Sequence, residues 1–65
     1  MKVKCIRDLV YYNENDDKMK FENGKVYEAQ DMEYFIRICL NENPYYRADL
    51  SKSWFDDYFE TVVDI

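Results

Sequence analysis

FENGKVYEAQDMEYFIRICL, residues 21–40, alternates turns with strands. Asn23 and Gly24, the only glycine in the chain, tolerate a positive φ, so a tight turn is predicted there. A strand is then predicted over Lys25–Gln30, a short turn over Asp31–Glu33, and a second strand over Tyr34–Leu40. By alternation, one face of this second strand holds Tyr34, Ile36, Ile38 and Leu40, and the other holds Phe35, Arg37 and Cys39.

Three more strands are predicted outside this stretch. Met1–Arg7 alternates apolar with basic side chains, which is typical of a half-buried strand. Asn41–Pro44 is predicted as a turn because proline cannot donate a hydrogen bond to a sheet. Tyr45–Leu50 follows as a strand, and Phe59–Val63 is the closing strand.

The segment Ser51–Tyr58, SKSWFDDY, interrupts the strand pattern. Ser51 or Ser53 can cap the N-terminus of a helix. Asp56 and Asp57 are predicted to lie near that positively polarised end. So short a segment has room for a single helical or 3₁₀ turn rather than a long helix.

Asp8–Lys20 separates the first strand from the turn at Gly24. Its centre, Asn13–Asp17, consists of Asn, Glu and Asp residues, which favour neither a strand nor a helix interior. We therefore predict a long loop over Asp8–Lys20, and long loops in small domains are often functional.

These elements predict one domain over residues 1–65, with five short strands, a long early loop and one helical or 3₁₀ turn before the last strand. An open sheet would leave exposed edges, which favour association with other chains. A small closed or semi-closed barrel avoids this problem. The sequence therefore predicts an all-β fold, a small barrel.

Several segments carry a resemblance to a known family. The chain has an aromatic-bearing segment, Leu9–Tyr12, and then a polar loop. The segment Lys20–Ala29, KFENGKVYEA, follows and contains the turn glycine and the second strand. This order resembles the first half of an SH3-like barrel. The segments Val3–Ile6 and Gly24–Glu28 and the closing pattern W-F-x-x-x-F-E-x-V from Trp54 look like short SH3-like proteins of phages and prophages of low-GC Gram-positive bacteria. The resemblance implies a five-stranded SH3-like barrel.

The chain departs from peptide-binding SH3 domains at two motifs. Tyr34 and Phe35 stand where those domains carry adjacent tryptophans at the start of the third strand. The segment Ser53–Phe55 does not reproduce their proline–aromatic pair. The resemblance therefore does not imply recognition of proline-rich peptides.

The composition limits the chemistry that the chain can support. A formal net charge of −5 comes with no histidine, the most common general base and metal ligand. Cys5 and Cys39 are predicted to be reduced and buried. We therefore expect no catalytic residue, no metal site, no cofactor and no enzymatic activity. The sequence shows no apolar run typical of a signal peptide or a transmembrane helix, which predicts a cytoplasmic protein without a membrane partner.

Seven tyrosines and one tryptophan supply the candidate binding residues. Tyr and Trp are the usual anchors of protein interfaces. In an SH3-like barrel the early loop and the helical turn flank one groove, so Tyr12, Trp54 and Tyr58 are predicted to line a peptide-binding surface. Adjacent rings on a strand point to opposite faces, so one ring of each tyrosine pair should be exposed. The full set of partner-binding candidates is Tyr11, Tyr12, Tyr45, Tyr46, Trp54 and Tyr58.

Negative charge is concentrated late in the chain. Residues 1–25 hold six basic and five acidic side chains, whereas residues 26–65 hold three basic and nine acidic ones. An acidic face repels phosphates, so direct nucleic-acid binding is not expected. Such a face could imitate the charge of DNA and occupy a DNA-binding site on another protein, or it could only keep the protein soluble. The predicted acidic face comprises Asp49, Asp56, Asp57 and Glu60.

These observations, together with the resemblance to phage proteins, suggest three functions. The first is a non-catalytic protein-interaction module of phage or mobile-element type, which binds and modulates a host protein through an aromatic groove. The second is an acidic DNA-mimic inhibitor of a host nucleic-acid-processing or defence enzyme. The third is a small structural or assembly subunit that dimerises through an edge strand. A monomer or a small homo-oligomer is expected in the host cytosol.

Overall fold

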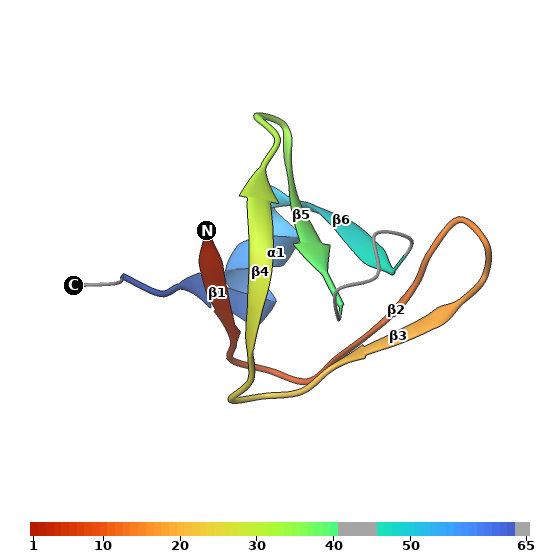
Figure 1. Cartoon of the computed structure of the whole chain (residues 1–65), viewed down its shortest axis with the longest axis horizontal. Coiled ribbons are helices and arrows are strands. Elements are labelled where there is room, and N and C mark those ends of the chain that lie inside the picture. Colours follow the sequence, from red (N-terminus) through yellow and green to blue (C-terminus); the bar gives the residue numbers. More distant parts are fainter. Residues whose placement is uncertain (41–45, 64–65) are drawn as a thin grey trace.

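The computed structural model describes residues 1–40 and 46–63 as seven strands and one helix (Figure 1). The strands are β1 (Lys2–Cys5), β2 (Leu9–Tyr12), β3 (Lys18–Phe21), β4 (Val26–Asp31), β5 (Phe35–Cys39), β6 (Arg47–Ser51) and β7 (Phe59–Thr61). The helix α1 (Lys52–Tyr58) follows β6 in the chain. The predicted turn Asn41–Pro44 and the predicted first residue of the next strand, Tyr45, lie outside the described residues.

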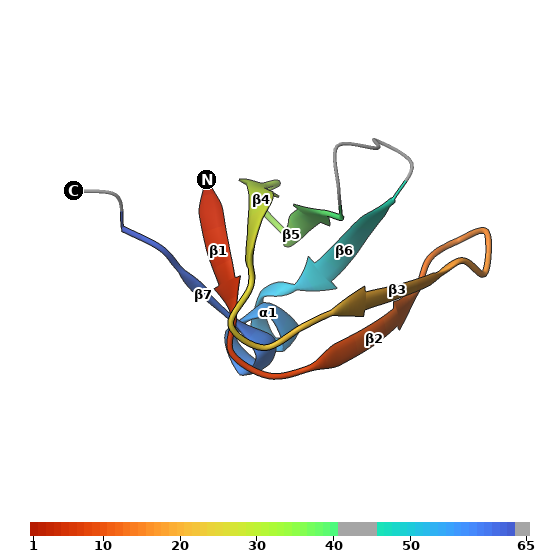
Figure 2. The same cartoon turned by 60° about the horizontal axis from the view of Figure 1, so that its bottom comes forward.

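Five strands form one antiparallel sheet in the order β6-β5-β4-β1-β7, which curls around the core like half of a barrel (Figures 1 and 2). These are the five strands that the sequence predicts, with ends that are shifted by up to two residues, so the all-β prediction is confirmed. The register places Val3 between Tyr27 and Thr61. It also places Ile36 opposite Leu50. Apolar side chains from neighbouring strands therefore meet on the concave face of the sheet.

The prediction of a loop over Asp8–Lys20 is wrong, because this segment forms most of a β-hairpin, β2–β3. The hairpin is held by apolar contact, since an isolated two-stranded ribbon is at best marginally stable in water. The polar run that favours a loop is confined to the connection between the two strands. The hairpin side chains that pack on or into the core are Leu9, Tyr11, Met19 and Phe21.

Asn13 organises the connection between β2 and β3. Its side-chain Oδ1 accepts hydrogen bonds from the backbone N–H groups of Asn15 and Asp17, both at 2.9 Å. Its backbone oxygen accepts a third from Asp16 at 3.0 Å, and Asp16 has a φ of 60°. Asn and Asp tolerate this left-handed conformation better than other non-glycine residues. The polar run therefore builds a tight hairpin connection.

The turn predicted at Asn23-Gly24 is confirmed. The N–H of Lys25 donates to the backbone oxygen of Glu22 at 3.1 Å, and Gly24 has a φ of 92°. A positive φ at the third residue of a four-residue turn favours glycine. The N–H of Gly24 also donates to the backbone oxygen of Cys5 at 2.7 Å. Because β3 and β4 pair with different strands, this turn forms the corner between the hairpin and the sheet.

Ser51 caps the N-terminus of α1, and it is one of the two serines predicted for this role. Its Oγ accepts a hydrogen bond from the backbone N–H of Trp54 at 3.3 Å. The helix has seven residues, and its first turn carries no acidic residue. Asp56 and Asp57 lie in the second turn, so the prediction that they stand near the N-terminus is wrong. The predicted helical segment is thus present, but it has about two turns where a single turn is predicted, and its acidic residues lie in the second turn.

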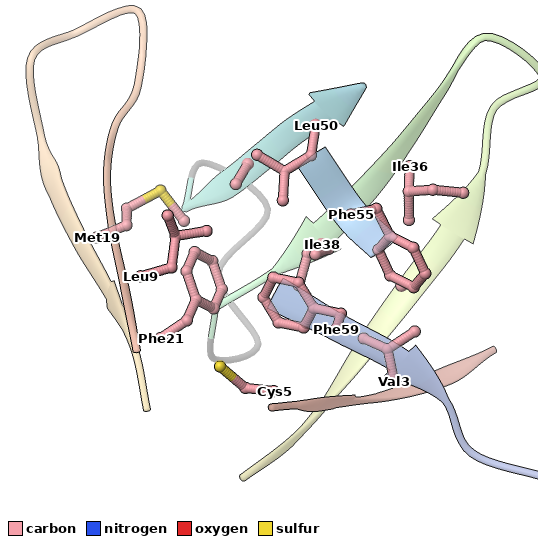
Figure 3. Close-up of a cluster of buried hydrophobic side chains, with 12 residues drawn as sticks. Val3, Cys5, Leu9, Met19, Phe21, Ile36, Ile38, Leu50, Phe55 and Phe59 are labelled. Carbon is pink, nitrogen blue, oxygen red and sulfur yellow. The ribbon is translucent and has the colours of Figure 1, made fainter. Parts of the chain in front are cut away.

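The core lies between the concave face of the sheet, the hairpin and α1 (Figure 3). Phe21, Tyr27 and Phe59 meet edge to face, with ring centroids 5.1, 5.5 and 6.3 Å apart. Phe55, the buried residue of α1, stacks on Phe59 at 5.7 Å. Such pairs stabilise a core beyond their buried area. The buried residues are Val3, Cys5, Leu9, Met19, Phe21, Ala29, Ile36, Ile38, Ala48, Leu50, Phe55 and Phe59.

The prediction that Tyr34 shares a strand face with Ile36 is wrong. β5 begins at Phe35, and Tyr34 precedes it with 82% of its surface exposed. The N–H of Tyr34 donates to the backbone oxygen of Met32 at 2.9 Å across Glu33, which has a φ of 74°. This hydrogen bond closes a three-residue γ-turn. The turn ends one residue later than the apolar alternation predicts, so the ring points to solvent.

Both cysteines are free thiols, as expected. Cys5 is fully buried in the core, whereas Cys39 is only half-buried, so the prediction of burial is confirmed for Cys5 alone. Cys39 alternates with the buried Ile38 along β5 and therefore points to the convex face of the sheet. The two thiols thus lie on opposite faces of the sheet.

Candidate interaction surface

Arg7, Trp54 and Tyr58 form a surface cluster that we call the Trp54 patch. Arg7 and Trp54 are exposed, and Tyr58 is half-buried against the core. The ring centroids of Trp54 and Tyr58 are 6.2 Å apart. The guanidinium carbon of Arg7 lies 5.4 Å from the centroid of the Tyr58 ring. This distance falls within the range of a cation–π interaction, about 6 Å. Trp54 is 49% exposed, so a partner could reach a large part of this residue.

Two features of the local fold position these side chains. Trp54 and Tyr58 are four residues apart in α1 and therefore lie on the same side of the helix. The N–H of Ile6 donates to the backbone oxygen of Tyr58 at 2.8 Å. This bond ties the end of α1 to the segment leaving β1, so Arg7 is held beside the Tyr58 ring.

The chemistry of the patch is that of a protein-binding anchor. Trp, Tyr and Arg are the residue types that dominate binding energy at protein interfaces. The two rings offer apolar area, whose removal from water favours association. The guanidinium offers hydrogen-bond donors that suit carbonyl and carboxylate oxygens. The patch therefore combines an apolar anchor with a directional polar group.

The structure brings only part of the predicted aromatic groove together. Trp54 and Tyr58 are neighbours, but Tyr12 is the last residue of β2, in the hairpin that extends away from α1 (Figure 2). Tyr12 is 60% exposed, whereas Tyr11 is half-buried against the core. This difference between adjacent tyrosines is the one predicted by strand alternation. Of the second tyrosine pair, Tyr46 is exposed directly before β6 and Tyr45 lies outside the described residues.

The predicted acidic residues lie on three elements. On β6, Asp49 accepts hydrogen bonds from the Arg37 guanidinium at 2.9 and 3.3 Å. The hydrogen bond to Asp49 raises the pKa of the Arg37 guanidinium. On β7, Glu60 lies opposite Lys4 of β1. The two acidic residues of α1, both exposed, are Asp56 and Asp57. Cations therefore pair with or face two of the four carboxylates.

The sequence pattern does not indicate Arg7 or Tyr34 as a candidate surface residue. Arg7 gains its role from Tyr58, which lies near the other end of the chain, and no local spacing signals this contact. Tyr34 is exposed because Glu33 adopts a positive φ. No glycine marks that turn, so its position had no clear sequence signal.

The chain matches no protein-family model, no curated protein and no solved structure. Within residues 1–40 and 46–63, no group of three His, Cys, Asp or Glu side chains is placed to hold a metal ion. In the same part of the chain, no helix has the length and apolar character needed to cross a bilayer. Functional inference therefore rests on the surface of the molecule, and first on the Trp54 patch.

Proposed function

We propose that the protein is a non-catalytic interaction module that binds another protein through the Trp54 patch. The observation that carries this proposal is the half-exposed ring of Trp54, the only tryptophan of the chain, beside the Arg7–Tyr58 contact. Burial of the exposed part of such a ring would be favourable by on the order of 1 kcal/mol. A partner that covers the ring would recover that free energy as binding energy.

A finer proposal concerns the fold, which we infer to be an SH3-like barrel. It is supported by three features: a hairpin between the first two strands of the sheet, the sheet order β6-β5-β4-β1-β7, and the short helix before the last strand. The short helix before the last strand follows the order of elements that the sequence resemblance implies, and the hairpin stands where the resemblance implies a loop. In such a fold the helical segment borders the binding surface, and the Trp54 patch contains two residues of this segment.

We further propose that the partner is a host protein, which the module modulates. This part rests on the resemblance of the sequence to short SH3-like proteins of phages. Asp56 and Asp57, exposed on the same helix as Trp54, would place negative charge at the rim of the patch. Rim charges orient a partner and raise the association rate more than they raise affinity.

Replacement of Trp54 by Ala tests the proposal. Tagged wild-type protein, Trp54→Ala and Tyr34→Ala are each presented to a Gram-positive host lysate, and captured proteins are quantified. Loss of a hot-spot side chain weakens binding by about 2 kcal/mol or more, roughly 30-fold. We expect a partner that the wild type and Tyr34→Ala retain and that Trp54→Ala loses.

Tyr34→Ala is the matched control because Tyr34 is a more exposed aromatic residue outside the Trp54 patch. Thermal unfolding of the three proteins verifies that they are equally folded. Equal capture by the wild type and Trp54→Ala contradicts the proposal.

The DNA-mimic alternative remains a prediction without specific support from the described residues. Asp49 already pairs with Arg37, and Glu60 lies opposite Lys4 on the adjacent strand. These cations reduce the continuous negative field that imitation of DNA requires.

A further inference from the structure

β6 forms one edge of the five-stranded sheet among the described strands (Figure 1). The backbone oxygen of Tyr46 accepts a hydrogen bond from the N–H of Leu40 at 2.8 Å, so Tyr46 faces β5 with its backbone. In an antiparallel ladder this facing alternates from residue to residue. Arg47 and Asp49 therefore present their backbone N–H and C=O groups to the open side of β6.

The same two residues carry opposite charges. Arg47 and Asp49 are exposed on the convex face of the sheet, and Ala48 between them is fully buried on the concave face. When two copies of such a strand pair antiparallel, the cation of each copy can lie opposite the anion of the other. We propose that β6 pairs with β6 of a second copy of this chain, antiparallel, about a two-fold axis at Ala48.

One register satisfies both the backbone and the charges. Hydrogen bonding requires that residues with outward-facing backbones lie opposite each other. A register that centres on Arg47, or one that centres on Asp49, places like charges directly opposite, which is destabilising. The register that centres on Ala48 places Arg47 opposite Asp49 of the second copy, twice by symmetry. Each of these pairs exchanges two backbone hydrogen bonds.

This register also extends a charge ladder that is already present. Arg37 of β5 donates to Asp49 at 2.9 Å from one side. Arg47 of the second copy would approach the same carboxylate from the other side, and a carboxylate can accept hydrogen bonds from both guanidinium groups. On the concave face, Tyr46 would lie opposite Leu50 of the second copy. Tyr46, now 37% exposed, would lose part of its contact with water.

The opposite edge of the sheet offers no such match. The N–H of Val62 donates to the backbone oxygen of Lys2 at 2.9 Å, so Val62 faces β1. Its neighbours Thr61 and Val63 face the open side of β7, and neither carries a charge. Self-pairing at that edge has no charge pattern to fix its register, which is why we assign the interface to β6.

Sedimentation velocity of the wild type and two charge reversals tests this interface. The wild type should dimerise in a concentration-dependent manner at or below about 1 mM, the weak end of specific association. Added salt should weaken the dimer because it screens the exposed pairs. Arg47→Asp alone, or Asp49→Arg alone, places like charges in both pairs, and we expect dimerisation to weaken at least tenfold in each.

The equimolar mixture of the two variants decides the register. In a mixed dimer every pair between the two copies again joins opposite charges, so a heterodimer should form more tightly than the homodimer of either variant, even though Asp49→Arg loses the hydrogen bonds from Arg37. An unfolded variant could not be rescued in this way. Glu14→Arg, which makes the same charge change as Asp49→Arg on the exposed hairpin connection, should leave the wild-type dimer intact.

Three results would overturn the proposal: a wild type that stays monomeric throughout this range, a dimer that both single variants retain, or a mixture that remains monomeric. The test is independent of the proposed function. Trp54 lies on α1, outside β6, so Trp54→Ala should leave dimerisation unchanged.

Discussion

Three described residues have a φ in the left-handed region, and only one of them is a glycine: Asp16 at 60°, Glu33 at 74° and Gly24 at 92°. Side-chain hydrogen bonds support the other two. At Asp16 the support comes from Asn13, whose Oδ1 bonds the residues on either side. At Glu33 it comes from Asp31, whose Oδ1 accepts the Glu33 N–H at 3.0 Å. Gly24 depends on its own conformational freedom.

Gly24→Ala should lower the free energy of unfolding by about 1–2 kcal/mol, the cost of a left-handed conformation for a residue with a Cβ. An added Cβ would meet nothing within 4 Å, so the loss comes from backbone strain and not from steric overlap. Urea unfolding measures it. Gly24→Asn is the control and should lose less, because Asn tolerates a positive φ. Unchanged stability of Gly24→Ala would contradict the described turn.

The two thiols should differ in reactivity. Burial raises the pKa of the Cys5 thiol, whose Sγ donates a hydrogen bond to the backbone oxygen of Arg7 at 2.9 Å. A thiol reagent added to the native protein should therefore label Cys39 first, as mass spectrometry of the peptides would show. Labelling of Cys5 at the rate of Cys39 would contradict its burial.

The same shift predicts a pH dependence with a definite sign. The fold favours the neutral Cys5 thiol, so its pKa is higher in the folded than in the unfolded state. The stability from this group is complete below the unfolded pKa and falls as the pH rises through the folded pKa. Cys5→Ser should show a smaller loss of stability at alkaline pH than the wild type.

At the scale of single residues, the sequence signals Ser51 and Gly24 and does not signal Tyr34. The Ser51 side chain caps the helix, and Gly24 adopts a positive φ because it has no side chain. Both properties can be read from the residue type alone. The exposure of Tyr34 depends on the positive φ of Glu33 and on the Asp31 hydrogen bond that supports it. Apolar alternation carries no information about such a turn.

At the scale of elements, the hairpin β2–β3 is the main difference between prediction and structure. Its two strands have four residues each, and its connection is the most polar run of the chain. Local polarity therefore indicates a loop. The hairpin depends instead on Met19 and Phe21, which are fully buried against strands distant in the sequence. Tertiary packing determines this element, and local pattern does not show it.

Asn13→Ala should destabilise the hairpin connection. The substitution leaves the N–H groups of Asn15 and Asp17 without the Oδ1 acceptor. Net losses of about 0.5–1.5 kcal/mol per hydrogen bond are typical, and exposure to water favours the low end. Amide hydrogen exchange of β2 and β3 should become faster than in Glu14→Ala, a control on the same connection. Equal exchange in the two variants would contradict this role of Asn13.

At the scale of the whole molecule, the sequence predicts the five strands of the sheet and its tendency to curl. It predicts the candidate site only in part. Trp54 and Tyr58 are neighbours because α1 spaces them four residues apart, which a local pattern can indicate. Tyr12 is separate because β2 carries it along the hairpin, away from α1. Arg7 joins the patch through a contact between the two ends of the chain.

The central claim is that Trp54 binds a partner, and ¹⁹F NMR of protein labelled with 5-fluorotryptophan tests it most directly. The chain has one tryptophan, so the label gives a single resonance at the Trp54 patch. In an unlabelled Gram-positive host lysate, we expect this resonance to shift or broaden. Excess unlabelled wild-type protein should reverse the change, and excess Trp54→Ala should not. A resonance that stays unchanged in the lysate, or a change that Trp54→Ala reverses equally well, would contradict the claim.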